Sequence, residues 1–256
     1  MIQPILANAA VYAIENATTE GKITVLVLLV LSLFSWTIII TKFRQLTIAR
    51  KATKKFMAAY ISTRDPLDIK KRGEDFDGAP AYALYERGAE ELAYQLKKNP
   101  VTVKGERRIS LSSYEAVKVV LEEAASAQAM SLEKGMIVLS TAVAGGPFIG
   151  LLGTVWGVMS TFAGIAASNS ASLTAMAPGV AAALVATVTG LLVAIPAMFA
   201  YNFMVTTVRA ITQELDGFAS RYANQIEHAY VDNRDIEDKI AWALTKTEMG
   251  ENTPAI

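Results

Sequence analysis

The sequence predicts an all-α membrane protein: three transmembrane helices and a cytoplasmic helical domain, with helices that extend from the membrane into the cytoplasm. The first observation is composition, since 52% of the 256 residues are hydrophobic and the mean hydropathy is +0.32. The second is a run of 74 residues between Lys134 and Arg209 without Asp, Glu, Lys or Arg, where a charged fraction of 19% would place about 14. The third is a run of 19 uncharged residues between Lys22 and Lys42. Membrane spans require such gaps in charge, and soluble cores do not.

The two uncharged runs predict where the spans lie. As a helix, the first run is roughly 28 Å long, close to the ~30 Å hydrocarbon thickness of a bilayer, and it predicts a span at 22–42. The second run is long enough for two spans and contains a polar break, ASNSASLTA, at 167–175. We therefore expect a second span at 135–166, a periplasmic loop at 167–177 and a third span at 178–205. The second span exceeds what a bilayer requires, so it should tilt or protrude.

The distribution of Lys and Arg predicts the orientation in a bacterial inner (cytoplasmic) membrane. Residues 1–21 contain no Lys or Arg, whereas residues 43–134 contain 17. By the positive-inside rule, 1–21 is a periplasmic N-terminal segment, and both 43–134 and the C-terminal helix and tail at 206–256 are cytoplasmic. The segment PILANAAVYAIE at 4–15 favours a short interfacial helix over a cleaved signal peptide, because no basic residue precedes it.

The cytoplasmic residues predict helices punctuated by Pro and Gly, and no strand. One helix should continue from the first span to about residue 61, and another should run over 79–98. A third should run from about 110 through 134 and continue into the second span. The third span should extend as a helix to about residue 230.

Composition excludes several functional classes. The 24 Lys+Arg balance 24 Asp+Glu, so the chain lacks the basic excess of a nucleic-acid binder. It has no Cys and a single His, which excludes disulfides, zinc–thiolate sites and multi-histidine metal sites. The membrane runs hold no nucleophile–base pair, and the cytoplasmic residues hold no phosphate-binding glycine motif. We therefore predict no enzymatic activity, no cofactor and no metal site.

The absence of ionisable residues in the spans also limits ion transport. Proton carriers normally need an ionisable group within the membrane, and 23–41 and 135–208 contain no Asp, Glu, Lys or Arg. Either the chain is not part of a proton channel, or a partner protein supplies the acid.

Small residues in the spans predict close helix packing. In the second span, five glycines recur at steps that keep one helix face: Gly146, Gly150, Gly153, Gly157 and Gly164. Such a face allows close helix approach, either within the chain or between subunits. Pro147 should kink or loosen this helix, and Pro178, Gly179 and Pro196 are further packing positions.

Three threonines are candidate pore residues. Thr154 and Thr161 lie seven residues apart, on a second face of the same span, and Thr187 lies in the third span beside Ala183 and Gly190. These hydroxyls could simply bond the carbonyl four residues back in their own helix. Alternatively, they line a polar surface for a guest helix or water.

Two segments resemble the signatures of the MotA/TolQ/ExbB proton-channel family, and of its ExbB/TolQ branch most closely. They are PFIGLLGTVWGVMST at 147–161 and APGVAAALVATVTGLLVAIPAMFAYN at 177–202, and SWTIIITKFRQLTIAR at 35–50 is similar more weakly. The resemblance covers all three spans in their order.

This resemblance implies a homopentamer around a dimer of a single-span partner of the ExbD/TolR type, whose membrane Asp carries the proton. The complex then works at the outer membrane or cell wall, in biopolymer import or envelope maintenance, through a TonB- or TolA-like protein. The family's polar pore residues match Thr154 and Thr187. In one position the chain departs from the ExbB/TolQ branch, because Ala182 stands where that branch usually has Glu. A Glu ring is therefore not part of this chain's mechanism, and sodium stays open as the coupling ion.

Our leading hypothesis is therefore a channel subunit of a motor driven by the proton-motive force. Two alternatives remain at this point. One is a membrane scaffold that conducts no ions and whose glycine-rich faces only assemble a complex. The other is a MotA-like flagellar or gliding stator with sodium as coupling ion.

Overall fold

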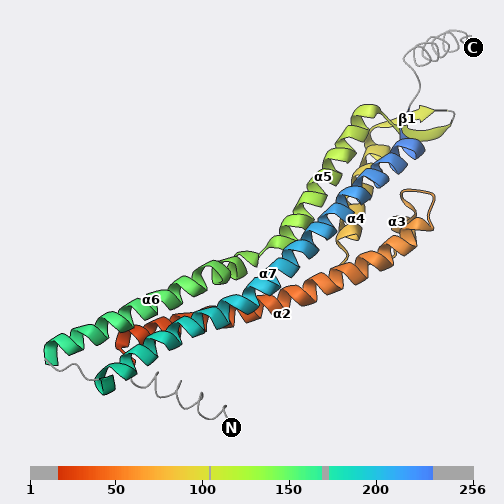
Figure 1. The fold of residues 1–256 in the computed structure, drawn as a ribbon. Helices are drawn as coiled ribbons and strands as arrows, with labels where there is room; N and C mark the ends of the chain where they lie inside the picture. The colour runs from red at the N-terminus through yellow and green to blue at the C-terminus, as the bar shows by residue number, and fades with distance from the viewer. Residues whose placement is uncertain (1–16, 104, 169–172, 233–256) are drawn as a thin grey trace, which may run out of the picture. The chain divides into compact units, whose positions relative to one another are not determined.

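The computed structural model describes residues 17–103, 105–168 and 173–232, which are almost entirely helical. The elements, in chain order, are α2 (Thr19–Ile61), α3 (Asp68–Arg72), α4 (Pro80–Lys98), β1 (Pro100–Val103), β2 (Glu106–Ile109), α5 (Leu111–Glu133), α6 (Met136–Ser168) and α7 (Leu173–Tyr230) (Figure 1). The predicted interfacial helix at 4–15 and the end of the predicted tail, 233–256, lie outside the described residues.

Three of these helices are long and apolar enough to cross a membrane, as the fold class predicted. They are Thr19–Ile61, Met136–Ala167 and Met176–Tyr230. The described residues divide into two compact units, one made of residues 17–48 and 129–211, the other of 49–128 and 212–232. We call these the membrane unit and the extramembrane unit, and each is described by itself.

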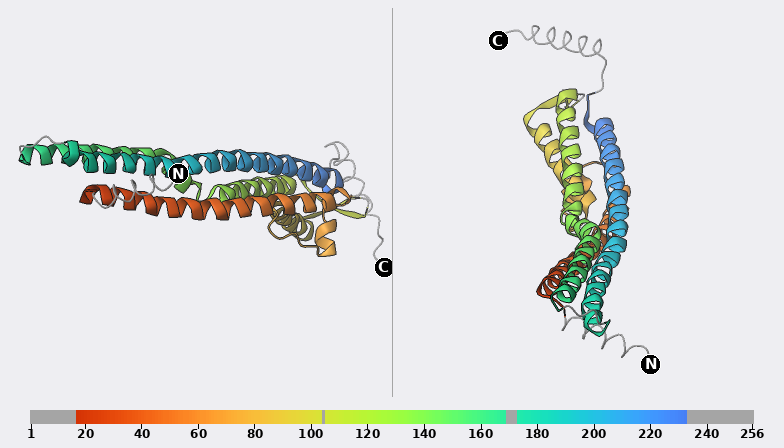
Figure 2. Two further views of the ribbon diagram at one scale, coloured as in Figure 1. Left: turned by 60° about the horizontal axis from the view of Figure 1, so that its bottom comes forward. Right: turned by 60° about the vertical axis from the view of Figure 1, so that its left-hand side comes forward.

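In the membrane unit, α2 buries only a narrow seam of its surface. Thr24, Leu28, Ser35 and Lys42 are buried at steps of four and seven residues, whereas Leu33, Phe34 and Trp36 on other faces are exposed. A helix in lipid needs no fully covered apolar surface, because the bilayer itself is an apolar solvent. Helices α6 and the first half of α7 lie side by side in Figure 1 and in the two views of Figure 2.

The extramembrane unit has a core of aromatic rings. Phe56 from α2 lies at its centre, with ring centroids 5.4–5.8 Å from five other rings, those of Tyr60, Phe76, Tyr82, Tyr85 and Phe218. Burial raises the pKa of Tyr85 to about 12, so this phenol stays neutral at physiological pH. The cluster joins the end of α2 to α4 and α7, and edge-to-face pairs of this kind add to the gain from burial.

A β-hairpin corrects the expectation that the cytoplasmic residues contain no strand. β1 and β2 pair antiparallel, with Pro100 opposite Ile109, and Gly105 in the turn has φ of +82°. The residues directly after α7 then add a parallel bridge between Ile109 and Val231, and the Asp232 N–H donates to the Ile109 carbonyl at 3.1 Å. The hairpin therefore depends on residues more than 100 positions away.

Two helix boundaries also differ from the expectation. The third cytoplasmic helix does not continue into the second span, because α5 ends at Glu133 and α6 begins at Met136. Gly135 lies at this break, and its φ of +87° is a left-handed backbone conformation that glycine favours and that interrupts a right-handed helix. The loop expected at 167–177 is mostly helical, since α6 continues to Ser168 and α7 begins at Leu173.

Candidate ion-pathway site between α6 and α7

The predicted glycine face of α6 packs against α7 of the same chain. Gly146, Gly150, Gly153 and Gly157 are all buried. A Cβ added at Gly150 would lie 3.0 Å from the Ala186 carbonyl oxygen and 3.1 Å from the Thr187 Cα. A real Cβ is rarely so close to backbone atoms, so the glycine lets the two helices approach more closely than a larger residue would.

The partner face of α7 is also built of small residues. Ala183 faces Gly157, Ala186 faces Gly153, and Gly190 faces Gly146, where an added Cβ at Gly190 would lie 2.5 Å from the Gly146 carbonyl oxygen. Of the two interpretations of the glycine stripe, these contacts match packing within one chain. Gly164, at the far end of the stripe, takes no part in this contact, since an added Cβ there would have no neighbour within 4 Å.

The close approach brings Thr154 and Thr187 together. Their hydroxyl oxygens are hydrogen-bonded to each other across the α6–α7 contact. The Thr154 hydroxyl also lies 3.2 Å from the Ala183 carbonyl oxygen and 3.3 Å from that of Gly150. The Thr187 hydroxyl lies 3.2 Å from the same Gly150 carbonyl. Two side chains 33 positions apart in sequence thus form one polar cluster in an apolar unit.

This cluster offers more acceptors than it has hydrogens to donate. Each hydroxyl carries one hydrogen and two lone pairs, and the two hydroxyls share two backbone carbonyls and each other. The pair can therefore hold its hydrogens in more than one arrangement and still accept a hydrogen bond from another group. Both side chains are half-buried, so the cluster reaches the surface of the single chain.

The other predicted site residues lie outside this cluster. The Thr161 hydroxyl donates to the Gly157 carbonyl of its own helix at 2.8 Å, and an added Cβ at Gly179 would collide with it. Pro147, Pro178 and Pro196 are half-buried, and α6 and α7 continue as helices past them.

A buried lysine at the end of the first apolar run was not singled out by sequence reasoning. Lys42 is 7% exposed, and its ammonium donates to the carbonyl oxygens of Leu132 at 3.0 Å and Ser131 at 3.3 Å. Those carbonyls belong to the last turn of α5, whose backbone acceptors have no partner within the helix. Its position in the sequence could have drawn attention to it, because Lys42 is the first charged residue after the apolar run.

Neither a metal site nor a membrane carboxylate appears in the described part of the chain. In residues 17–103, 105–168 and 173–232, no three His, Asp or Glu side chains gather as metal ligands. Within the charge-free run at 135–208, the polar groups of the described residues between α6 and α7 are therefore hydroxyls and carbonyls.

Comparison with known proteins gives the family. A sequence model of the MotA/TolQ/ExbB proton channel family matches residues 90–217, half of the chain. The chain is 31% identical over 215 residues to the Tol-Pal system protein TolQ of Haemophilus influenzae, covering 81% of this chain and 89% of that protein.

Two biopolymer transport proteins named ExbB are similarly related. The protein of Neisseria meningitidis is 33% identical over 196 residues, covering 75% of this chain and 85% of its own length. That of Xanthomonas campestris is 31% identical over 199 residues, covering 77% and 78%. These relatives are transport proteins rather than enzymes. With its three apolar helices, the chain is a multi-pass inner-membrane protein that belongs to the MotA/TolQ/ExbB proton channel family, as a channel component of the ExbB/TolQ type.

Proposed function

We propose that the chain is the stator subunit of an inner-membrane motor driven by the proton-motive force. Five copies form a ring around a dimer of a single-span ExbD/TolR-like partner, whose membrane Asp carries the proton. Ion flow moves the inner dimer, and the partner, with a TonB- or TolA-like protein, performs work at the outer membrane or cell wall. In this arrangement residues 1–21 are periplasmic, and 43–134 and 206–256 are cytoplasmic.

The observation that carries this proposal is the Thr154–Thr187 cluster in spans that contain no acid. Residues 23–41 and 135–208 offer no Asp, Glu, Lys or Arg to carry a proton, so an acid must come from another chain. A carboxyl group from a partner needs a polar neighbour to lower the cost of entering an apolar environment. The two hydroxyls supply it, because they can donate to a carboxylate or accept from a carboxylic acid.

The contacts of the glycine stripe favour a channel subunit over a scaffold. The scaffold hypothesis requires the glycine faces to assemble different chains. In this chain Gly146, Gly150, Gly153 and Gly157 already contact α7. That face is thus used to hold α6 and α7 in register, which is what places the two threonines together.

The experiment that tests the proposal is the native mass of the complex purified from its own host membranes, with every subunit identified. We expect five copies of this chain with two copies of a small single-span protein that has an Asp in its membrane helix. Proton uptake by vesicles containing the complex should depend on that Asp. A monomer, a dimer or a partner-free assembly would leave the membrane without an acid and would favour the scaffold hypothesis.

A further inference from the structure

A pocket of about 350 Å³ lies between the start of α6 and the middle of α7, within the membrane unit. Glu133 and Arg209 lie in its lining, together with the apolar side chains of Met136, Ile137 and Val205 and the ring of Tyr201. It is distinct from the Thr154–Thr187 cluster, since none of its lining residues belongs to that cluster.

The pocket is lined by residues from both sequence ends of the charge-free run, at the start of α6 and in the middle of α7. The charge-free run occupies 135–208, and Glu133 and Arg209 are the charged residues of the pocket on either side of it. Lys42, at the end of the first apolar run, contacts the same chain segment through the carbonyls of Ser131 and Leu132. Tyr201 is a residue type that is common at membrane–water interfaces, because its ring is apolar and its hydroxyl is polar. The pocket thus combines a charged end with an apolar end at the membrane boundary.

The two charges of the pocket do not neutralise each other. Both side chains are exposed, and within the part of the chain that the structure describes neither forms an ion pair. An anionic ligand would suit Arg209 but would be repelled by Glu133, and a cationic ligand would have the opposite difficulty. A ligand with one charge of each sign satisfies both residues.

We propose that this pocket binds a zwitterionic phospholipid, phosphatidylethanolamine, by its headgroup. The Arg209 guanidinium donates to the phosphate, which matches its forked geometry, and the primary ammonium of the lipid donates to the Glu133 carboxylate. One acyl chain lies along Met136, Ile137 and Val205. Phosphatidylcholine fits less well because its quaternary nitrogen has no N–H to donate. Phosphatidylglycerol fits less well because it has no ammonium for Glu133.

Lipid retention by the full-length chain tests this site without any ion gradient, so its outcome is independent of the proposed motor function. The protein is purified in mild detergent from nanodiscs containing equal amounts of phosphatidylethanolamine, phosphatidylglycerol and phosphatidylcholine. The lipids that remain bound are counted by native mass spectrometry. We expect the wild-type protein to retain phosphatidylethanolamine preferentially. Arg209→Gln should lower this retention roughly tenfold, since a charge-assisted hydrogen bond is lost.

Glu133→Gln makes the more specific change. With Arg209 intact and the carboxylate removed, retention should move from phosphatidylethanolamine toward phosphatidylglycerol. Val205→Phe fills the apolar end without changing charge and should lower retention of all three lipids. The matched control is Arg44→Gln, an exposed arginine near the end of the first apolar run that does not line the pocket. Unchanged elution volume and helical circular dichroism show that each variant is folded.

Two results would overturn the proposal. One is an equal lipid profile for wild type, Glu133→Gln and Arg209→Gln. The other is a pocket covered by a second copy of the chain, which cysteine crosslinking detects because the chain has no cysteine of its own. Copies carrying Ile137→Cys and copies carrying Val205→Cys, mixed in one membrane, would then form disulfide-linked dimers and retain no lipid. The proposal is supported if the wild-type protein retains phosphatidylethanolamine preferentially and Glu133→Gln moves that preference toward phosphatidylglycerol.

Discussion

Two hydroxyl groups carry the polar chemistry between α6 and α7. Thr154 and Thr187 bond to each other and to the carbonyls of Gly150 and Ala183, so each hydrogen already has an acceptor within the chain. A hydroxyl can turn about its C–O bond and change its acceptor without moving its helix. The cluster can therefore follow a change in the charge of the carboxyl group that the proposed partner would bring beside it, at little structural cost.

Removal of these hydroxyls should impair energised function and leave assembly intact. Thr154→Val and Thr187→Val keep the branched shape and lose the hydrogen bonds, so we expect each to lower proton-gradient-dependent activity roughly tenfold or more. Thr187→Ser, which keeps a hydroxyl, should retain most activity. The control is Thr189→Val, because that hydroxyl donates only to Val185 of its own helix, at 2.8 Å. Full activity of both valine variants would remove these residues from the ion pathway.

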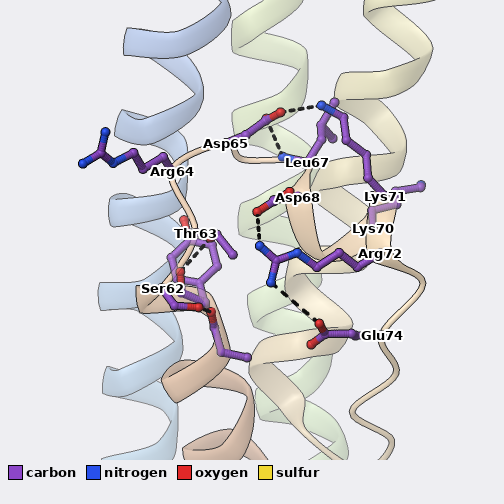
Figure 3. Close-up of polar contacts among 12 residues, drawn as sticks. Ser62, Thr63, Arg64, Asp65, Leu67, Asp68, Lys70, Lys71, Arg72 and Glu74 are labelled. Carbon is purple, nitrogen blue, oxygen red and sulfur yellow. Dashed lines mark hydrogen bonds and ion pairs between the residues drawn. The ribbon is translucent and has the colours of Figure 1, made fainter.

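Asp65 ties the segment after α2 to the end of α7. Its carboxylate accepts hydrogen bonds from the Lys71 ammonium and the Leu67 N–H (Figure 3), and from the Tyr230 hydroxyl at 2.8 Å. Burial by itself would raise the pKa of Asp65, but these hydrogen bonds outweigh it and hold the pKa below its ordinary value of 3.8.

This arrangement predicts a loss of local stability in acid. A carboxyl whose pKa is lowered by folding stabilises the folded state above its ordinary pKa, and that contribution is lost as pH falls through the lower, folded value. The protection factor of the Leu67 amide, which is the intrinsic exchange rate at a given pH divided by the observed rate, should therefore fall below a pH of about 4. Asp65→Asn, which lacks the charge, should show a low protection factor of the Leu67 amide at every pH, whereas Asp77→Asn, at an exposed acid, should behave as wild type. A protection factor of the Leu67 amide that does not change with pH in the wild-type chain would contradict this role.

At the scale of elements, glycine determines the distance between α6 and α7. Gly150→Ala should destabilise the membrane unit by about 1–3 kcal/mol, because its Cβ would press on the Ala186 carbonyl and the Thr187 backbone, which cannot turn away. Gly164→Ala is the matched variant, since no atom lies within 4 Å of its added Cβ, and alanine should stabilise a helix there by up to about 1 kcal/mol. Thermal unfolding in detergent, followed by circular dichroism, measures both. Equal melting temperatures would show that the α6–α7 contact tolerates a larger separation.

The elements that the sequence predicts well are those whose signal is local. Apolar runs and Pro–Gly punctuation located α2, α4 and the C-terminal end of α7 to within a few residues, because each signal lies in the element itself. The β-hairpin escaped prediction since its strands have four residues each and depend on Val231. The break at Gly135 was missed because glycine is also common inside membrane helices, and the sequence does not reveal a positive φ.

The candidate site was predicted in part. Family resemblance named Thr154 and Thr187, and periodicity placed each on a face of its own helix. Periodicity does not give the register between two helices, so the bond between the hydroxyls and the bond to Ala183 required coordinates. Ala183, Ala186 and Gly190 recur at steps of three and four, and this small-residue face on α7 was the available signal for the register.

At the scale of the whole molecule, two helices are much longer than a membrane is thick. α2 has 43 residues and α7 has 58, so they measure roughly 65 Å and 87 Å at 1.5 Å per residue, against a hydrocarbon thickness of ~30 Å. In both helices most of the Lys and Arg residues lie in the excess length that follows the apolar part, and the exception is Lys22, which precedes the apolar run of α2. Each of these helices must therefore leave the membrane at its C-terminal end, on the same side.

The distribution of basic residues predicts that this side is the cytoplasm, and single cysteines test it. The chain has no Cys, so Ala167→Cys and Ile61→Cys each introduce one thiol at an exposed position. If the distribution of basic residues sets the orientation, Ala167 lies on the periplasmic side, and a membrane-impermeant maleimide should label Ala167→Cys in spheroplasts with an intact inner membrane. Ile61→Cys, 77% exposed at the end of α2, should react only after that membrane is permeabilised. The reverse labelling pattern would invert the topology. It would place the basic residues outside, against the charge asymmetry that orients membrane proteins.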